Sequence, residues 1–178
     1  METSDETLAQ AAARGDAEAF AALMGRHYDG VFRLAFRLTG VRADAEDLTQ
    51  DVCAALPVKL EGYRGDAQFR TWLWRVVVNA AHDRRRRTAT HARHAEGWGD
   101  WERARRAADQ DAAEVSDWLT QAMRALPPEL QDTLALVLDG MSHAEAGKVL
   151  DVSEGTISWR ISQAKDRLRA LREREDQE

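Results

Sequence analysis

The chain has 178 residues, 44% of them hydrophobic, which is enough apolar material for the cores of one or two small domains. No apolar run reaches about 18 residues and no charged-then-apolar leader follows Met1, so we expect a cytoplasmic protein without a membrane span or secretory signal. The single cysteine, Cys53, excludes an internal disulfide and a cysteine-based zinc site, and its place on an apolar stripe fits a core thiol.

The net charge of −6 is distributed unevenly along the chain. Residues 1–69 carry seven basic and twelve acidic side chains, whereas residues 70–93 carry seven basic and only one acidic. A local patch governs polyanion binding more than the total charge does. We therefore expect residues 70–93 to meet nucleic acid, and the acidic remainder to keep the free protein's affinity for DNA low.

The first two predicted helices lie within residues 7–39. A short alanine-rich helix covers 7–13. Asp16 is a predicted N-cap of a longer helix whose apolar residues recur at steps of three and four up to Leu38. Gly40 then supplies a C-terminal cap.

A third helix is predicted over 44–56, where Pro57 should end it. One side of this helix is apolar, and the other is acidic, comprising Asp44, Asp47, Gln50 and Asp51. Acidic residues in a first turn favour the helix dipole, but Asp51 lies beyond that turn. The residues alone leave open whether this is a solvated face or a face that binds a partner.

Residues 60–68 contain two glycines and no apolar period, which predicts a loop. Its side chains suit stacking on an unpaired base and hydrogen bonding to it, although a plain exposed turn is the more common structure for a loop of this composition. The following helix, 69–87, has an apolar face formed by Phe69, Trp72, Leu73, Val76, Val77 and Ala80. It ends in Arg84 to Arg87, which cannot be buried and must meet water or a polyanion.

Residues 89–114 predict a flexible linker with a helical piece at 101–108. His91 and His94 have no third ligand in reach, so no metal site is expected.

A second domain is predicted from residue 115, with helices over 119–126 and 129–138. Ser142 to Glu145 forms a capping box for a short helix, in which Ala146-Gly147 should pack loosely. A tight turn at Asp151 leads to a last helix N-capped by Ser153. Two helices joined by so short a turn are typical of a helix-turn-helix.

The outward face of the last helix carries residue types found in DNA readers. Arg160 and Gln163 suit guanine and adenine edges, and Lys165 suits phosphates. Trp159 lies nearly opposite the apolar stripe, so it either meets a ligand or packs on a neighbouring element.

Four strings occur in a specific order: Asp44 to Asp51, Phe69 to Arg75 with Asn79 and Asp83, Leu126 to Glu129, and Gly155 to Ile157 followed by Arg160. In this order and spacing the chain resembles the extracytoplasmic-function (group IV) sigma factors of bacterial RNA polymerase, over about residues 16–174. The resemblance implies an all-α fold of two small domains. Region 2 would cover 16–88, a linker 89–114, and the helix-turn-helix of region 4 residues 115–174.

The same resemblance implies roles for individual residues. The acidic helix would dock on the clamp helices of the polymerase's largest catalytic subunit through Asp47, Gln50 and Asp51, and region 4 would meet the flap of the second-largest subunit. The residues implied in binding minus-ten DNA are Tyr63, Arg64, Asp66, Gln68, Arg70, Trp74, Arg75, Asn79, Arg84 and Arg85, with Asn79 as the main base contact. Those implied in binding the minus-thirty-five element are Ser153, Thr156, Ser158, Trp159, Arg160, Gln163 and Lys165.

The implied function is a sigma factor that binds core RNA polymerase and directs promoter recognition, DNA melting and transcription initiation under an anti-sigma factor. It would not itself be an enzyme, and no cofactor or metal is expected. Two alternatives are a sigma mimic that titrates an anti-sigma factor and a stand-alone helix-turn-helix regulator. A hydrolase built on His82, Asp83, His91 and His94 is disfavoured because no nucleophile motif accompanies them.

Overall fold

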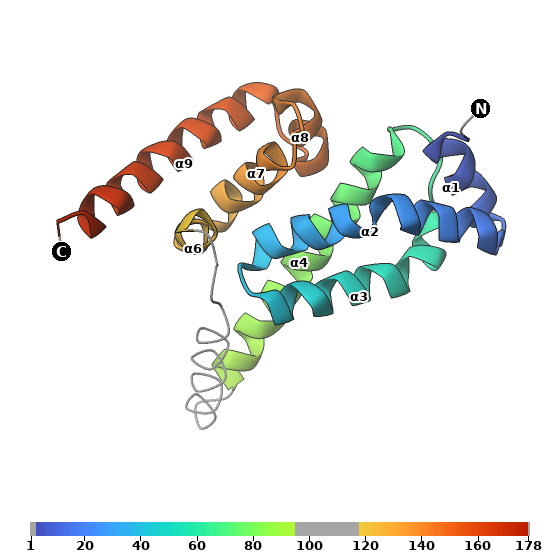
Figure 1. Ribbon diagram of the computed structural model, residues 1–178, viewed down its shortest axis with the longest axis horizontal. Helices are drawn as coiled ribbons and strands as arrows, with labels where there is room; N and C mark the ends of the chain where they lie inside the picture. Colours follow the sequence, from blue (N-terminus) through green and yellow to red (C-terminus); the bar gives the residue numbers. More distant parts are fainter. Residues whose placement is uncertain (1–2, 95–117, 178) are drawn as a thin grey trace.

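The computed structural model describes residues 3–94 and 118–177, which form helices and no strand, as predicted (Figure 1). The predicted helical piece at 101–108 and the side chains of His91 and His94 lie outside the described residues. The helices are α1 (Asp5–Ala13), α2 (Ala17–Thr39), α3 (Arg42–Leu60), α4 (Phe69–His94), α6 (Trp118–Arg124), α7 (Pro128–Leu138), α8 (His143–Leu150) and α9 (Glu154–Glu175).

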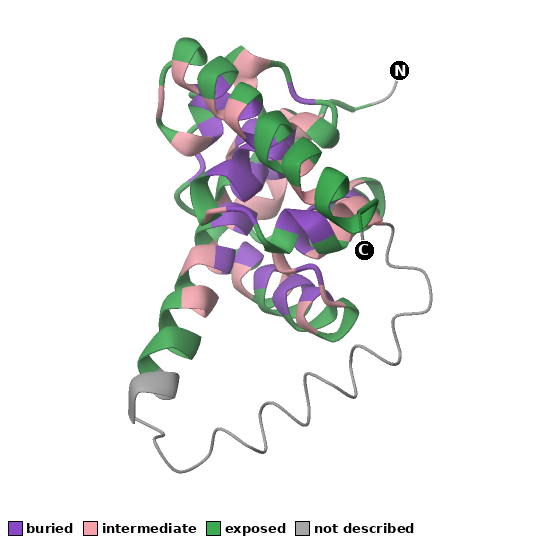
Figure 2. Cartoon of the chain, turned by 90° about the vertical axis from the view of Figure 1, so that its left-hand side faces the viewer, coloured by how far each residue is buried: buried purple, intermediate pink, exposed green. Residues whose placement is uncertain are grey.

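Helices α1 to α4 form an N-terminal bundle in which α2 packs against α1, α3 and α4. Leu34, Leu48 and Leu73, one from each of the three long helices, are at most 1% exposed and lie at the centre of the core. Buried residues line the inner sides of these helices, whereas the end of α4 projects beyond the bundle and is exposed (Figure 2).

The predicted ends of α2 are confirmed. The Asp16 carboxylate accepts hydrogen bonds of 3.0 Å from the backbone N–H groups of Glu18 and Ala19, which the helix itself cannot satisfy. At the other end Gly40 has a φ of 69°, and its N–H donates to the Phe36 carbonyl. This left-handed cap turns the chain sharply into α3.

The prediction that Pro57 ends the third helix was wrong, because α3 continues to Leu60. Proline removes one N–H from the helical ladder. Leu56 and Leu60 are only 2% and 1% exposed, and keeping the chain helical is what places Leu60 in the core. The free energy of burying that side chain offsets the missing hydrogen bond.

Helix α4 also continues past its predicted end at Arg87. Phe69, Leu73 and Val77 are buried as predicted, but so are Trp74 and Val78, which the apolar pattern did not include. The helix therefore buries a wider surface than a single stripe, because the C-terminal domain packs on a second side of it.

Helices α6 to α9 form the C-terminal domain, in which α9 packs against α7 and α8. The Ser142 capping box is confirmed, since the Glu145 carboxylate accepts from the Ser142 N–H at 2.8 Å and the Ser142 hydroxyl accepts from the Glu145 N–H at 3.2 Å. The backbone and hydroxyl hydrogen bonds from Ser142 hold the pKa of Glu145 below its usual value. Asp151 forms the left-handed turn at a φ of 56°, and Ser153 caps α9.

The expectation that α8 packs loosely was wrong. Ala146 and Gly147 are both buried, and a Cβ placed on Gly147 would lie 2.7 Å from the Val152 carbonyl oxygen. The missing side chain lets the turn after α8 close directly onto the helix, so the small residues tighten the helix-turn-helix.

We expect Gly147→Ala to lower the stability of the C-terminal domain by about 1–3 kcal/mol, because the contacted oxygen belongs to backbone that cannot swing away. Gly155→Ala is a matched control on α9, where the nearest atom to the added Cβ is the Ser153 hydroxyl at 3.8 Å. Thermal unfolding followed by circular dichroism measures both variants. A Gly147→Ala melting temperature equal to that of Gly155→Ala would contradict this packing.

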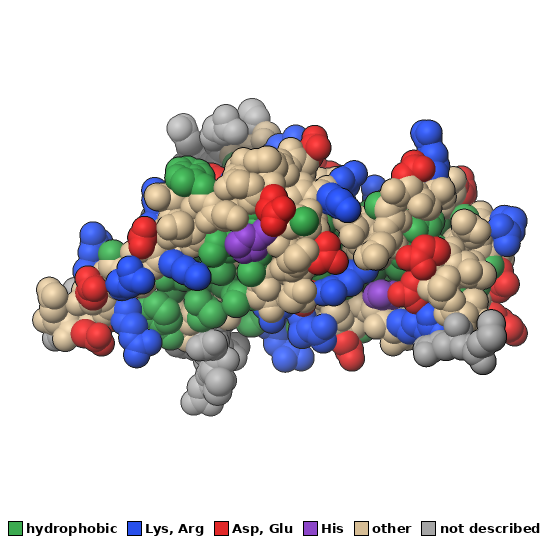
Figure 3. Space-filling view, turned by 90° about the horizontal axis from the view of Figure 1, so that it is seen from above, with side chains coloured by type: hydrophobic (Ala, Val, Ile, Leu, Met, Phe, Trp, Pro, Cys, Tyr) green, Lys and Arg blue, Asp and Glu red, His purple; other side chains and the backbone are tan. Residues whose placement is uncertain are grey.

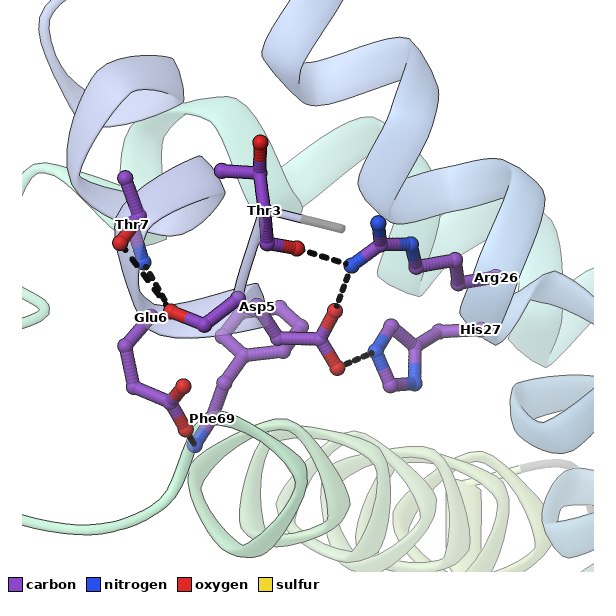
Figure 4. Close-up of polar contacts among 8 residues, drawn as sticks. Thr3, Asp5, Glu6, Thr7, Arg26, His27 and Phe69 are labelled. Carbon is purple, nitrogen blue, oxygen red and sulfur yellow. Dashed lines mark hydrogen bonds and ion pairs between the residues drawn. The ribbon is translucent and has the colours of Figure 1, made fainter. Parts of the chain in front are cut away.

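The N-terminal helix joins the bundle through two carboxylates (Figure 4). Glu6 accepts from the backbone N–H of Phe69 at 3.2 Å and so caps the start of α4 from a distant part of the sequence. Asp5 accepts from Arg26 and pairs with His27, both at 2.7 Å. Partial burial opposes the ionisation of Asp5, but the hydrogen bonds from these two residues outweigh it and lower its pKa.

The lowered pKa of Asp5 predicts a pH-dependent stability. The ionised carboxylate stabilises the fold above the unfolded-state pKa of 3.8, and this contribution is lost as the pH falls through the lower folded-state pKa. Asp5→Asn should therefore cost about 1 kcal/mol at pH 7 and progressively less below pH 4. Melting curves at several pH values test this, and a difference that stays constant into acid would refute it.

Candidate nucleic-acid interface

The predicted polymerase-docking residues Asp47, Gln50 and Asp51 are all exposed on α3. Arg84 of α4 donates to Asp44 at 2.9 Å and to Asp47 at 3.2 Å. Burial opposes the charge of Arg84, but these two carboxylates outweigh it and raise its pKa. Arg84 is thus held against α3, and part of the acidic face is neutralised within the bundle.

The loop between α3 and α4 presents only some of its predicted side chains. Arg64, Asp66 and Gln68 are exposed. Tyr63 is 8% exposed, its hydroxyl donates to the Ala67 carbonyl at 2.9 Å, and its ring packs on Phe69 and Trp72. Burial and the nearby carboxylates raise its pKa.

The expectation that Tyr63 stacks on a base conflicts with this burial. An aromatic ring enclosed by two others has no free face for a nucleobase. Tyr63 instead fixes the path of the loop that carries the three exposed polar residues.

One part of the outward side of α4 is exposed, and another part is buried against the C-terminal domain. Arg75 and Asn79 are exposed. Trp74 is 2% exposed, and its indole N–H donates to Asp139 of the C-terminal domain at 2.9 Å. A direct contact of Trp74 with DNA is therefore excluded in this conformation by its burial between the two domains.

The two remaining predicted arginines on α4 also bind the C-terminal domain. Arg70 donates to the side chain of Asp139 at 3.1 Å and to its carbonyl at 2.6 Å, and Arg85 donates to Asp132 at 2.6 Å. Arg75 donates to the carbonyl of Lys148 as well, although its side chain stays exposed.

The predicted residues on α9 lie on its outer side. Trp159 is 60% exposed, so its own domain does not bury it. Ser153 is used as the N-cap, accepting from the Thr156 N–H at 3.1 Å, and Ser158 hydrogen-bonds His143 at 2.9 Å. Lys165 is exposed, whereas Thr156, Arg160 and Gln163 are half-buried.

Three residues that join the domains were missed from the sequence: Gln131, Asp132 and Asp139. A signal was present for two of them, because Gln131 and Asp132 lie between the apolar residues Leu130 and Leu134 of α7. Buried polar side chains require partners, and here those partners lie in the other domain.

Within residues 3–94 and 118–177, no helix is both long and apolar enough to cross a membrane, and no three metal-ligating side chains converge.

The comparisons with known proteins agree with the order of the two domains. The family model of Sigma-70 region 2 matches residues 23–90, and that of Sigma-70, region 4 matches residues 116–168. The ECF RNA polymerase sigma factor SigM of Mycobacterium tuberculosis is 34% identical over 172 residues, which cover 96% of this chain and 85% of SigM. The chain belongs to the extracytoplasmic-function sigma factors.

Solved structures share the fold of this sigma factor. CnrH, solved in complex with the cytosolic domain of CnrY, superposes with a TM-score of 0.68 at 29% identity, covering 95% of this chain and 97% of CnrH. The sigma factor RpoE of Bartonella quintana, solved with the anti-sigma factor NepR, shows the same fold with a TM-score of 0.66 at 20% identity. The match covers 88% of this chain and 98% of RpoE.

Proposed function

We propose that this sigma factor binds core RNA polymerase through Gln50 and Asp51 of α3 and places α4 on the melted minus-ten element of promoters. The observation that carries this assignment is the exposure of these two residues on α3, together with that of Asn79 on α4, within the sigma-70 region 2 match. Asp51 meets no cation among the described residues, so the clamp helices of the polymerase would supply one. Sigma factors are regulators of transcription initiation, and we assign the catalytic step to the polymerase alone.

Promoter melting without ATP requires unpaired bases to be bound more tightly than stacked ones. Binding one flipped base in a pocket offsets an unstacking cost of a few kcal/mol. Arg64, Asp66 and Gln68, held by the buried Tyr63, are the side chains we assign to that pocket, with Asn79 reading a neighbouring base. The amide of asparagine both donates and accepts, which suits base edges.

The C-terminal domain would read the minus-thirty-five element with α9. Arg160 and Gln163 suit base edges in the major groove, Lys165 suits phosphates, and the exposed Trp159 offers an apolar surface to a thymine methyl group. Joining two reading modules raises their effective concentration for each other when the spacer length fits. We place the two domains at 16–88 and 115–174, with the linker at 89–114.

Control by an anti-sigma factor is the second part of the proposal. CnrH, a solved relative, was solved in complex with another protein, the cytosolic domain of CnrY. An apolar groove lies where α2 meets α6 and α7, and the cations Arg33 and Arg37 are among its lining residues. Figure 3 shows a face of the molecule on which hydrophobic side chains gather. A partner helix with an apolar face and acidic edges would fit it. The lining residues are Phe32, Arg33, Phe36, Arg37, Leu119, Thr120, Met123 and Leu138.

Run-off transcription with core polymerase on genomic fragments tests the function. We expect discrete transcripts that require this protein. Their absence, in a reaction whose core polymerase is shown to be active, would refute the sigma-factor function. Specific DNA binding without polymerase would favour a stand-alone helix-turn-helix regulator. Failure to bind core, with an anti-sigma factor still bound, would favour a sigma mimic.

A further inference from the structure

We propose that the free sigma factor is autoinhibited, because Asp132 and Asp139 of its own C-terminal domain bind the α4 side chains that would otherwise hold minus-ten DNA. The inference rests on the proposed role of α4 in binding that DNA. Helix α7 packs against α2, and α8 packs against α4, so the two domains lie side by side (Figure 1).

Asp139 lies at the centre of the contacts between the two domains. Its side chain is 2% exposed, and its carboxylate accepts from Arg37 at 2.9 Å, Trp74 at 2.9 Å and Arg70 at 3.1 Å. Arg33 lies 3.8 Å away. A carboxylate buried this deeply is stable only when cations or donors surround it, and every one of these partners belongs to the N-terminal bundle. Asp139 therefore depends on the closed arrangement.

Asp132 makes a second, similar contact. Its side chain is 4% exposed, and its two oxygens bind Arg85 and His82 of α4, both at 2.6 Å. The other terminal nitrogen of Arg85, Nη1, is buried without a hydrogen-bond partner among the described residues. The closed interface thus leaves one charged donor unsatisfied, which reduces its stability and favours reversible opening.

The remaining contacts fix where the domains meet. The side-chain amide of Gln131 donates to the carbonyls of Leu38 at 3.1 Å and Arg37 at 3.3 Å, two of the carbonyls that the C-terminus of α2 leaves unpaired. The stem of Arg124 lies over Gly40, where a Cβ would come within 2.4 Å of it. Closure therefore uses shape and polar complementarity at the end of α2 as well as charge on α4.

The closed arrangement is incompatible with promoter binding for two reasons. Carboxylates occupy the guanidinium groups of Arg70 and Arg85, so phosphates cannot. The minus-ten and minus-thirty-five elements are also separated by about 25 base pairs, roughly 85 Å of B-form DNA at 3.4 Å per base pair, whereas a compact chain of this length has a radius of gyration of about 16 Å. Reading both elements requires α7 to leave α4, and polymerase docking would hold the domains apart.

The first test measures the distance between the domains directly. Spin labels on Ala22→Cys in α2 and Ala170→Cys in α9, in a Cys53→Ser background, report on it by pulsed electron paramagnetic resonance. We expect one narrow distribution of distances in the otherwise unchanged free protein, and a broad distribution in Asp132→Asn/Asp139→Asn. The charge-matched control is Asp166→Asn/Asp176→Asn in α9 and its C-terminal cap, which should stay closed. A broad distribution in the parent, or no change in the double variant, would overturn the proposal.

The second test measures DNA affinity of the free protein with a fluorescein-labelled random 20-nucleotide single strand. Asp132→Asn/Asp139→Asn should bind about tenfold more tightly than the control pair, the ratio expected when a charge-assisted contact that closes the protein is lost. Circular dichroism confirms that each variant is folded. Equal affinities of the two pairs would show that closure does not cover the DNA-binding surface.

Arg37→Ala supplies an opening variant that leaves the C-terminal domain untouched. It removes a cation from the protein, so electrostatics alone predicts weaker DNA binding. Loss of its bond to Asp139 predicts the opposite, tighter binding, together with a broader distribution of distances between the labels. Weaker binding by Arg37→Ala would overturn the proposal. Neither the distance test nor the DNA-affinity test uses polymerase. A failure of the proposed function in run-off transcription can therefore be distinguished from a failure of the autoinhibition proposal.

Discussion

Asp51→Arg is expected to weaken binding of core RNA polymerase by more than about 100-fold, because it opposes one positive charge with another at the docking face. Asp51 is exposed on α3 and is not paired with Arg84, which binds Asp44 and Asp47 instead. The substitution therefore leaves the internal ion pairs of the bundle intact. Affinity can be measured by fluorescence anisotropy of labelled sigma factor titrated with core.

Glu61→Arg is the matched control for this prediction. It makes the same change in charge at an exposed position just past the end of α3, outside the proposed docking face. We expect it to bind core with nearly unchanged affinity, and both variants to give unaltered circular dichroism spectra. If Asp51→Arg keeps parental affinity for core, α3 is not the docking helix.

Asn79→Ala is expected to reduce promoter-specific transcription by about tenfold while leaving core binding unchanged. Asn79 is exposed near the middle of α4, and alanine removes its donor and acceptor without disturbing the helix. The loss should appear at the melting step, as a lower reactivity of unpaired thymines towards permanganate. Transcript yield at saturating sigma factor gives the magnitude.

Thr88→Ala provides the comparison on the same helix. Thr88 is also exposed, but it lies beyond the segment assigned to base contacts. We expect its transcripts to match those of the parent. Parental yield from Asn79→Ala, with the same promoters opened, would remove Asn79 from the proposed site and leave the loop between α3 and α4 as the candidate for base recognition.

Features set by neighbouring residues were predicted correctly from the sequence. The caps at Asp16, Gly40 and Ser142 and the left-handed turn at Asp151 all form as predicted. Each depends on a side chain or a backbone preference within a few residues, so local chemistry suffices. The prediction for Pro57 failed because the burial of Leu60 lies outside any local rule.

The candidate site likewise has features that the sequence predicts and features that depend on distant contacts. Sequence and family resemblance together predicted that α3, the loop, α4 and α9 are the interacting segments, because charge and apolar period mark them. They could not show that Tyr63 is enclosed by Phe69 and Trp72, since an aromatic residue in a polar loop looks exposed until its neighbours are placed. Nor could they show that Arg84 is paired with α3.

The sequence by itself determined the helices, their order and the family, since periodicity, caps and motif spacing are properties of short segments. Only the tertiary structure decided which of the outward residues are available. Asp132 and Asp139 lie far along the chain from Arg85, Arg70 and Trp74, and no local pattern pairs them. Their pairing is a consequence of packing α7 against the N-terminal bundle, where a buried carboxylate must find donors or be expelled.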